Sequence, residues 1–424
     1  MRGTKRLVTY AAMAAGVVAW LAGCGTGSTS AGVVGNTTIK ICTELPVSGA
    51  DTSSGKPAEN GATLAIKQAN DKHVIAGYTL VAVHYDDVGP SGTHDGPTGA
   101  NNIRQAIGDA LIAACVGPFN SAVAQAEMPL ANFAPLGLIS PSNTNPSLTK
   151  PSYGALATLR PTNKVTYFRV STTDDKQGPA NADYLFKTLK LSKVYIIDDT
   201  EVYGKGIADA FQAEWQSLGG TVLGHVGLDK THTDFKPELT AAAALHPDVI
   251  YYGGTDSDGG TLVRQQMGSV SGLESTVYAG GDGLQTDSFA KTTGAAGLGT
   301  IVTVASVNPD VLPTAATFKA DFTKMFPNAA DYGAYSANSY DATNIEIQAI
   351  KAALANGAHN PKDANDATGA KAFRQAVIDQ IAKTNYQGVT GKTSFDINGD
   401  TTNRVISIYK LGSDGWDFIT QLTV

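Results

Sequence analysis

Two kinds of hydrophobic run alternate along this chain. Short, nearly continuous apolar segments such as 39–45, 79–85 and 110–116 are typical of buried parallel strands. Longer segments with apolar residues three and four positions apart lie between them and predict helices. The further expected strands are 138–140, 167–170, 193–198, 221–228, 248–252, 276–279 and 300–305, and the expected helices are 58–70, 101–110, 121–133, 177–189, 206–218, 234–245, 261–267, 339–355 and 370–382. This order predicts an α/β protein with helices on both faces of parallel sheets.

The alternation restarts after residue 170, which predicts two doubly wound units. Ligands of open α/β sheets bind at the carboxyl ends of the strands. Two facing units would therefore enclose a ligand and close on it about a hinge. Near the end of the chain, segments 393–396 and 405–411 flank Asn398-Gly399, which predicts a β-hairpin with an Asn-Gly turn.

The composition excludes several classes of protein. Lys and Arg number 31 and Asp and Glu 38, a net charge of −7, and no basic run follows the N-terminal segment, so we expect no nucleic-acid partner. A hydrophobic share of 42% is enough for sizeable cores. No phosphate-binding or dinucleotide-binding motif occurs, and the seven histidines lack the spacing of metal ligands on a helix. We therefore expect neither a cofactor nor a metal.

Residues 1–23 have the pattern of a lipoprotein signal peptide. Basic residues at positions 2, 5 and 6 precede an apolar run over 7–21, which is shorter than the roughly 20 residues of a membrane-spanning helix. The run ends in Leu21-Ala22-Gly23-Cys24, which resembles the bacterial lipobox and implies lipidation of Cys24. The alternative is an ordinary secretory signal with an unrelated cysteine. Residues 24–37 then form a flexible tether, so we expect an extracytoplasmic protein that is lipid-anchored to the cell membrane.

Short motifs along the chain, most of them at the ends of expected strands, carry a resemblance to a known family. They are, in order, 45–49 (LPVSG), 85–87 (YDD), 117–121 (GPFNS), 139–144 (ISPSNT), 172–178 (TTDDKQG), 203–204 (YG), 251–254 (YYGG), 281–283 (GDG), 340–342 (YDA) and 391–396 (GKTSFD) with 399–400 (GD). In this order the chain resembles the type I periplasmic binding proteins, specifically the leucine/isoleucine/valine-binding proteins of ABC importers. The resemblance covers nearly all of residues 38–412.

The resemblance implies an architecture and a function. The first lobe would comprise residues 36–167 and 304–390, and the second lobe residues 168–303 and 391–424, with a hinge of three crossings between them. Such a protein captures an amino acid or a similar small polar ligand by hinge closure and delivers it to the permease of an ABC importer, without catalysis. A ligand-sensing receptor of the same fold, for an amide, urea or an aromatic acid, is the alternative.

The resemblance also implies ligand-binding residues. Hydroxyls and backbone N–H groups at a helix N-terminus would hold a carboxylate, an acidic side chain would hold the ammonium, and aromatic rings would form the walls. The corresponding residues are Ser121, Ser142, Asn143 and Thr144 for the carboxylate, with the Thr144 hydroxyl also available to the ammonium, Asp282 for the ammonium, Tyr203 and Tyr335 for the walls, and Ser54 and Thr255 where the family has tyrosines. The last two predict a wider and more polar pocket. Asn120, which precedes Ser121, is also an expected ligand-binding residue.

Simpler structural roles remain open for three of these residues. Tyr203 could be an aromatic residue that packs under a glycine at the start of a helix. Ser121 follows Asn120 at a strand-to-helix junction, so its hydroxyl could be a helix N-cap. Asp282-Gly283 could be a plain turn. An enzyme is the other class that we considered, because Ser53-Ser54-Gly55-Lys56 fits the S-x-x-K motif of penicillin-recognising enzymes. The remaining motifs of those enzymes occur here in the wrong order, so we expect no catalytic residues.

Two cysteines, Cys42 and Cys115, lie on expected neighbouring strands. We expect them to be buried free thiols, because adjacent parallel strands are a strained setting for a disulfide. A disulfide, which an extracytoplasmic compartment would allow, is the alternative.

Overall fold

The computed structural model describes residues 37–424. The predicted signal peptide, Cys24 and the tether up to residue 36 lie outside the described residues. None of the helices within 37–424 combines the length and the apolar character that crossing a membrane requires.

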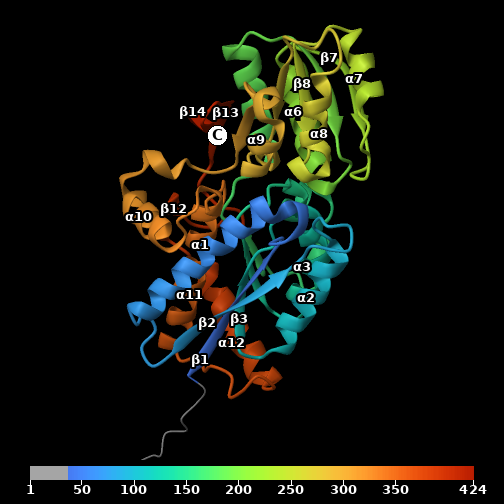
Figure 1. Ribbon diagram of the computed structural model, residues 1–424. Coiled ribbons are helices and arrows are strands. Elements are labelled where there is room, and N and C mark those ends of the chain that lie inside the picture. Colours follow the sequence, from blue (N-terminus) through green and yellow to red (C-terminus); the bar gives the residue numbers. More distant parts are fainter. Residues whose placement is uncertain (1–36) are drawn as a thin grey trace, which may run out of the picture. The chain divides into compact units, whose positions relative to one another are not determined.

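The first sheet is fully parallel, and helices cover both of its faces. Its strands are β1 (Thr38–Leu45), β2 (Thr79–Asp86), β3 (Ile112–Val116), β4 (Gly137–Ser140) and β5 (Tyr167–Arg169), in the spatial order β2-β1-β3-β4-β5. One face packs against α1 (Thr52–Asp71), α11 (Ser336–Ala355) and α12 (Ala367–Ile381), and the other against α2 (Gly96–Gly108) and α3 (Ser121–Phe133). Figure 1 shows α11 and α12, from late in the chain, beside α1 and β1. This sheet and its helices are the first lobe.

The second sheet has seven strands. Its strands are β6 (Lys193–Asp198), β7 (Thr221–Gly227), β8 (Val249–Gly253), β9 (Val277–Gly280), β10 (Ile301–Val304), β13 (Val405–Gly412) and β14 (Gly415–Thr423), in the order β14-β13-β10-β9-β8-β6-β7. The pairs that involve β13 are antiparallel and the others are parallel. One face packs against α5 (Asp174–Asp183) and α6 (Val202–Ser217), and the other against α7 (Lys236–Ala243), α8 (Thr261–Met267) and α9 (Asp287–Thr293). This sheet and its helices are the second lobe.

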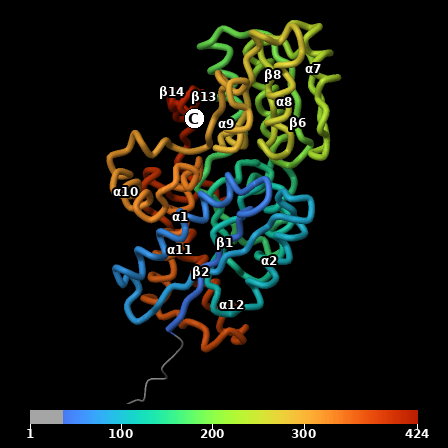
Figure 2. Tube along the Cα trace, in the orientation of Figure 1, coloured from blue at the N-terminus to red at the C-terminus, as the bar shows by residue number. Residues whose placement is uncertain are grey.

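The chain crosses between the two sheets three times. The crossings follow β5, follow β10 and precede β13. As a result, the blue N-terminal and orange segments share one lobe in Figure 2, while the last strands, β13 and β14, join the green and yellow segments of the other. Two doubly wound sheets joined by three crossings confirm the predicted type I periplasmic binding protein fold.

The predicted hairpin near the C-terminus is wrong in its pairing. Asn398-Gly399 does form a tight turn, because Gly399 has φ +89° and its N–H donates to the Asp396 carbonyl. An isolated bridge between Phe395 and Thr401 spans this turn, and no paired strands extend from it within residues 37–424. The partner of β13 is β14, the final strand, while β12 (Gly391–Thr393) pairs with β11 (Tyr386–Gly388). The sequence pattern also missed α10 (Ala316–Met325).

The expectation of two free thiols is wrong as well. Cys42 and Cys115 face each other in the β1–β3 register and form a disulfide, with their Cα atoms 4.4 Å apart. Both residues are fully buried, so the bond links the two strands within the core beneath α2 and α3.

Candidate functional site

The predicted ligand-binding residues follow the carboxyl ends of strands in both sheets. Ser54 lies in the first turn of α1 after β1, Asn120 and Ser121 follow β3, and residues 142–144 follow β4. In the second lobe, Tyr203 follows β6, Thr255 follows β8 and Asp282 follows β9. This is where open α/β sheets bind ligands.

Five of these residues line one cavity. The lining residues come from both lobes and are Asp51, Ser53, Ser54, Phe119, Asn120, Thr255, Asp282, Gly283, Gln285, Ala334 and Tyr335. The cavity has a volume of about 30 Å³, far below the roughly 300–1,000 Å³ of small-molecule pockets. A ligand as large as an amino acid therefore enters only when the lobes move apart.

Asp282 is the centre of the hydrogen bonds at this cavity. Its Oδ1 accepts from Gln177 Nε2 at 2.5 Å and from the Tyr203 hydroxyl at 2.9 Å, and its Oδ2 accepts from the Tyr335 hydroxyl at 2.9 Å. Tyr203 belongs to the second lobe and Tyr335 precedes α11 in the first lobe. Burial raises the pKa of Asp282, and the hydrogen bonds from Gln177, Tyr335 and Tyr203 oppose that shift. Asp282 is also the first residue of a short 3₁₀ turn. The turn role considered for Asp282-Gly283 is therefore compatible with a role of Asp282 at the cavity.

A second carboxylate, Asp174, lies within the electrostatic reach of Asp282. Burial, followed by the charge of Asp282, raises the pKa of Asp174 well above its usual value. Within residues 37–424, neither carboxyl oxygen of Asp174 has a hydrogen-bond partner of normal geometry, and the same is true of the Thr144 hydroxyl. The nearby Thr144 hydroxyl acts in the opposite direction and lowers the pKa of Asp174. A cation at this position would relieve the repulsion between the two carboxylates. Asp174 lies within the motif 172–178, but the sequence analysis did not single it out.

Two of the side chains predicted to bind the carboxylate form hydrogen bonds within the first lobe instead. The Ser142 hydroxyl and the Asn143 amide donate to the Phe119 carbonyl at 2.8 and 2.5 Å, and the Tyr167 hydroxyl donates to Asn143 Oδ1 at 2.8 Å. These bonds hold the loop that carries Phe119 and Asn120. For these two residues, the backbone N–H groups rather than the side chains are the groups to consider as ligand donors.

Ser121 is the first residue of α3, and Asn120 is the N-cap residue, whose side chain makes no capping bond. The plain N-cap role considered for Ser121 therefore does not hold. Ser121 is buried, with 2% of its surface exposed. The N-terminus of this 13-residue helix presents unpaired N–H groups, which favour an anion.

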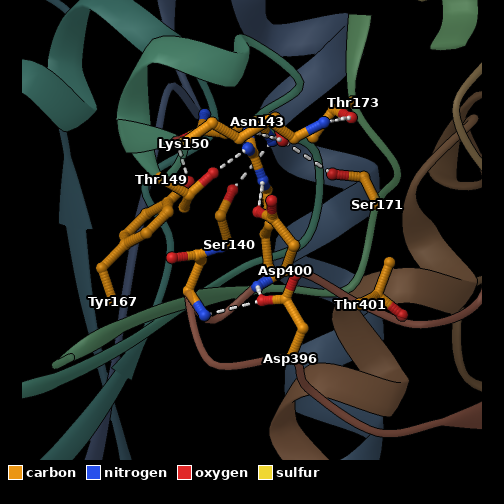
Figure 3. A network of polar contacts seen from close by, with 12 residues as sticks. Ser140, Asn143, Thr149, Lys150, Tyr167, Ser171, Thr173, Asp396, Asp400 and Thr401 are labelled. Carbon is orange, nitrogen blue, oxygen red and sulfur yellow. Dashed lines mark hydrogen bonds and ion pairs between the residues drawn. The ribbon is translucent and has the colours of Figure 1, made fainter. Parts of the chain in front are cut away.

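A buried arginine ties the loop after β4 to the hinge. Arg169, at the end of β5, donates from Nε to Asp400 Oδ1 at 2.7 Å and from a terminal nitrogen to the carbonyls of Asn143 and Asn145 at 3.2 and 2.8 Å. It also hydrogen-bonds Thr149. Figure 3 shows Asn143, Thr149 and Asp400 converging in this network. Arg169 and Asp400 lie at two of the three crossings, so the site loop and the hinge share one ion pair.

A histidine joins the lobes beside the cavity. Asp51 accepts from the N–H and from Nδ1 of His94, at 2.6 and 3.1 Å, and from the Ser257 hydroxyl of the second lobe at 2.5 Å. His94 Nε2 lies 3.8 Å from Asp258 Oδ2 of the second lobe. Burial would lower the pKa of His94, but the hydrogen bond to Asp51 and the charges of Asp258 and Asp51 overcome it and raise the pKa to about 9. His94 is therefore a cation held between two carboxylates.

The sequence analysis missed six lining residues: Asp51, Ser53, Phe119, Gly283, Gln285 and Ala334. Each is within three residues of a predicted site residue, and proximity in sequence was the signal available for them. Within residues 37–424, no group of three or more His, Cys, Asp or Glu side chains could hold a metal ion.

The chain is similar to a known protein family over most of its length. Residues 38–415 match the family model described as periplasmic binding protein. The Leu/Ile/Val-binding protein BraC3 of Rhizobium johnstonii is 30% identical over 373 residues, which cover 88% of this chain and 91% of that protein.

Two solved structures have the same fold. The leucine-binding protein LivK of Thermotoga maritima has a TM-score of 0.75 at 23% identity, covering 91% of this chain and 99% of that one. A solute-binding protein from Rhodopseudomonas palustris, in complex with p-hydroxybenzoic acid, has a TM-score of 0.74 at 17% identity, covering 91% and 97%. The extent of the family match and of the similarity to BraC3 shows that this chain belongs to the periplasmic binding protein family.

Proposed function

We propose that this protein captures a small ligand that bears an ammonium group, such as an amino acid, by closing its two lobes, and that it delivers this ligand to the permease of an ABC importer. The observation that carries the proposal is Asp282, whose carboxylate accepts hydrogen bonds from both lobes at the shared cavity. A carboxylate in this position pairs with a cation that would otherwise lose its hydration at a cost of several kcal/mol.

In this proposal the site has two charged ends. Asp282 and Asp174 receive the ammonium, because each pKa is raised and a cation would favour both ionised forms. The N-terminus of α3, at Ser121, together with the backbone of residues 142–144, receives the carboxylate. Tyr203 and Tyr335 enclose the ammonium end from opposite lobes.

The named relatives support the amino-acid class, since BraC3 is called a Leu/Ile/Val-binding protein. We further propose that a lipid on Cys24 holds the protein to the outer side of the cell membrane, where a permease can receive its ligand. The family in which the chain falls supports an extracytoplasmic location.

A thermal-shift screen of the purified protein tests the ligand class. The panel contains the amino acids, acetamide, urea and p-hydroxybenzoate, each at millimolar concentration. A ligand at 100 times its dissociation constant adds about 2.7 kcal/mol to the free energy of unfolding. We expect an amino acid to raise the melting temperature and to be recovered unchanged after incubation. Stabilisation by p-hydroxybenzoate or urea alone would overturn the ammonium assignment, and recovery of an altered ligand would overturn the binding role.

A further inference from the structure

Three buried polar atoms of residues that line the cavity have no hydrogen-bond partner among the described residues. They are the Ser53 hydroxyl oxygen, Asn120 Oδ1 and Gln285 Oε1. All three residues line the cavity that Asp282 lines. Ser53 and Asn120 belong to the first lobe, and Gln285 follows the turn of Asp282 in the second lobe. The residues that carry the unpaired acceptors therefore lie on both sides of one cavity.

All three atoms can accept a hydrogen bond. An unpaired buried acceptor is costly, whereas a hydrogen-bonded one is not, so such groups are normally paired. Lysine, arginine and histidine are absent from the lining residues, and the other polar groups there include the carboxylates of Asp51 and Asp282. The lining thus carries no cationic side chain to pair with these three acceptors, and a ligand that pairs with them must supply donors.

Asn120 and Gln285 add a preference for an amide. A primary amide has two N–H donors and one carbonyl acceptor, and it can pair with another amide through both groups. Phe119 and Ala334 are the lining residues with wholly apolar side chains. A hydrocarbon side chain in the cavity would leave Ser53, Asn120 and Gln285 unpaired.

Resting on the function proposed above, we propose that the ligand is an amino acid with an amide or a hydroxyl in its side chain, and that Ser53, Asn120 and Gln285 select it against leucine, isoleucine and valine. Sites built to hydrogen-bond a ligand reject the analogue that lacks the donor far more strongly than apolar pockets reject an extra methylene. We expect glutamine, asparagine or serine to bind at least about tenfold more tightly than leucine.

Isothermal titration calorimetry of the full chain with L-glutamine, L-asparagine, L-serine, L-leucine and L-isoleucine tests this. In the variants Gln285→Met and Ser53→Ala, the ratio of the leucine affinity to the affinity of the best polar ligand should rise about tenfold or more, because an acceptor that leucine leaves unpaired is gone. Gln216→Met, at an exposed position on α6, is the matched control and should leave the ratio unchanged. The unfolding midpoint of each variant shows whether it folds.

The possible results distinguish the selectivity for polar side chains from the proposed amino-acid-binding function. If leucine or isoleucine binds most tightly to the parent chain, the polar selectivity is wrong while the proposed function stands. An unchanged affinity ratio in both folded variants overturns the assignment of Ser53 and Gln285. If none of the amino acids binds, the proposed function and this inference fail together.

Discussion

Three interacting carboxyl groups are buried together in the first lobe. Glu44, Asp87 and Glu127 are fully buried where β1, β2 and α3 meet. Burial, followed by the charge of a neighbouring member of the cluster, raises the pKa of Glu44 and Asp87 well above the usual value, and burial does the same for Glu127. Since like charges this close cannot all ionise, the group must retain protons at pH values where free carboxyls have lost theirs.

We expect His94 to make the free energy of unfolding depend on pH. The groups that face it are Asp51, Asp258, Asp87 and Lys230. Because its pKa rises from 6.5 to about 9 on folding, its contribution is complete below pH 6.5 and is lost as the pH rises through 9. We expect His94→Gln to remove a pH-dependent contribution of the order of 3 kcal/mol from the interval between those values.

Urea unfolding of the parent and the variant from pH 5.5 to 9.5 measures this difference. His359→Gln serves as the control for histidine replacement. If the difference in unfolding free energy between parent and His94→Gln stays constant over the interval, His94 is not held as a cation.

The sequence could identify the residues at the centre of the site but not most of the contacts that surround them. Asp282, Tyr203 and Tyr335 were all predicted, and the structure brings them together. Their neighbours Gln177 and Asp174 depend on how α5 packs beside the end of β9, and short-range patterns do not determine such packing. For the same reason, the inward orientation of Asn143 could not be read from its motif.

Helices and strands were predicted best where the hydrophobic pattern is continuous. The limits of α3, β6 and α8 agree with the predicted segments residue for residue. The failure near β13 has a physical cause. β14 alternates half-buried and exposed residues at the sheet edge, a weak signal, while the Asn-Gly turn before β13 is a strong hairpin signal. The local turn formed as predicted, and the long-range pairing took a different partner.

Helix α11 carries one buried acid with no compensation. Glu346 is fully buried, and neither of its carboxyl oxygens has a hydrogen-bond partner in the part of the chain that the structure describes. Burial raises its pKa well above the usual value. We expect Glu346→Met to raise the free energy of unfolding by about 1–3 kcal/mol, since it replaces an unpaired polar group by an apolar one of similar volume.

The increase in the free energy of unfolding of Glu346→Met should be larger at pH 8 than at pH 5. The reason is that the Glu346 carboxyl of the parent is compatible with burial in the folded state only while it is protonated. Urea unfolding at both pH values measures it, with Glu274→Met, at an exposed position, as the control. A variant less stable than the parent at pH 8 would show that Glu346 has a stabilising partner.

The crossings between the sheets depend on the ion pair of Arg169 and Asp400. Arg169 is fully buried and Asp400 is 7% exposed. Removing one partner of a buried pair leaves an uncompensated charge, so Asp400→Ala should lower the free energy of unfolding by about 3–5 kcal/mol. The midpoint of urea unfolding measures the loss, with Asp414→Ala, in the exposed turn between β13 and β14, as control. Equal midpoints for the two variants would contradict this role.

As a whole, the molecule joins its lobes through polar contacts rather than through a shared core. Tyr335 to Asp282, Ser257 to Asp51 and the Asp174 N–H to the Thr144 carbonyl all run between the lobes. The main apolar clusters each belong to one sheet and its helices. Polar contacts of this kind can exchange partners with water or a ligand, which suits a protein that opens and closes.

The proposed lipid anchor at Cys24 lies outside the described residues. If Cys24 is lipidated, Cys24→Ser should abolish the lipid and release the protein from the membrane fraction or leave it unprocessed. One acyl chain anchors only marginally, whereas a cysteine that carries two or three chains holds firmly. Metabolic labelling with a fatty acid, followed by cell fractionation, measures both properties. Label retained on the variant would contradict the assignment, and Cys115 is no alternative acceptor because it is buried in the disulfide.

The most direct test of the whole account is the affinity of Asp282 variants for the amino acid found by the screen. Calorimetry should show that Asp282→Ala and Asp282→Asn each weaken binding by about 2–5 kcal/mol, since both remove the charge that pairs with a desolvated ammonium. Asp414→Asn, which removes a charge from an exposed turn, should bind as the parent does. If a folded Asp282→Asn binds the same ligand as tightly as the parent, the site does not recognise an ammonium and the central claim is wrong.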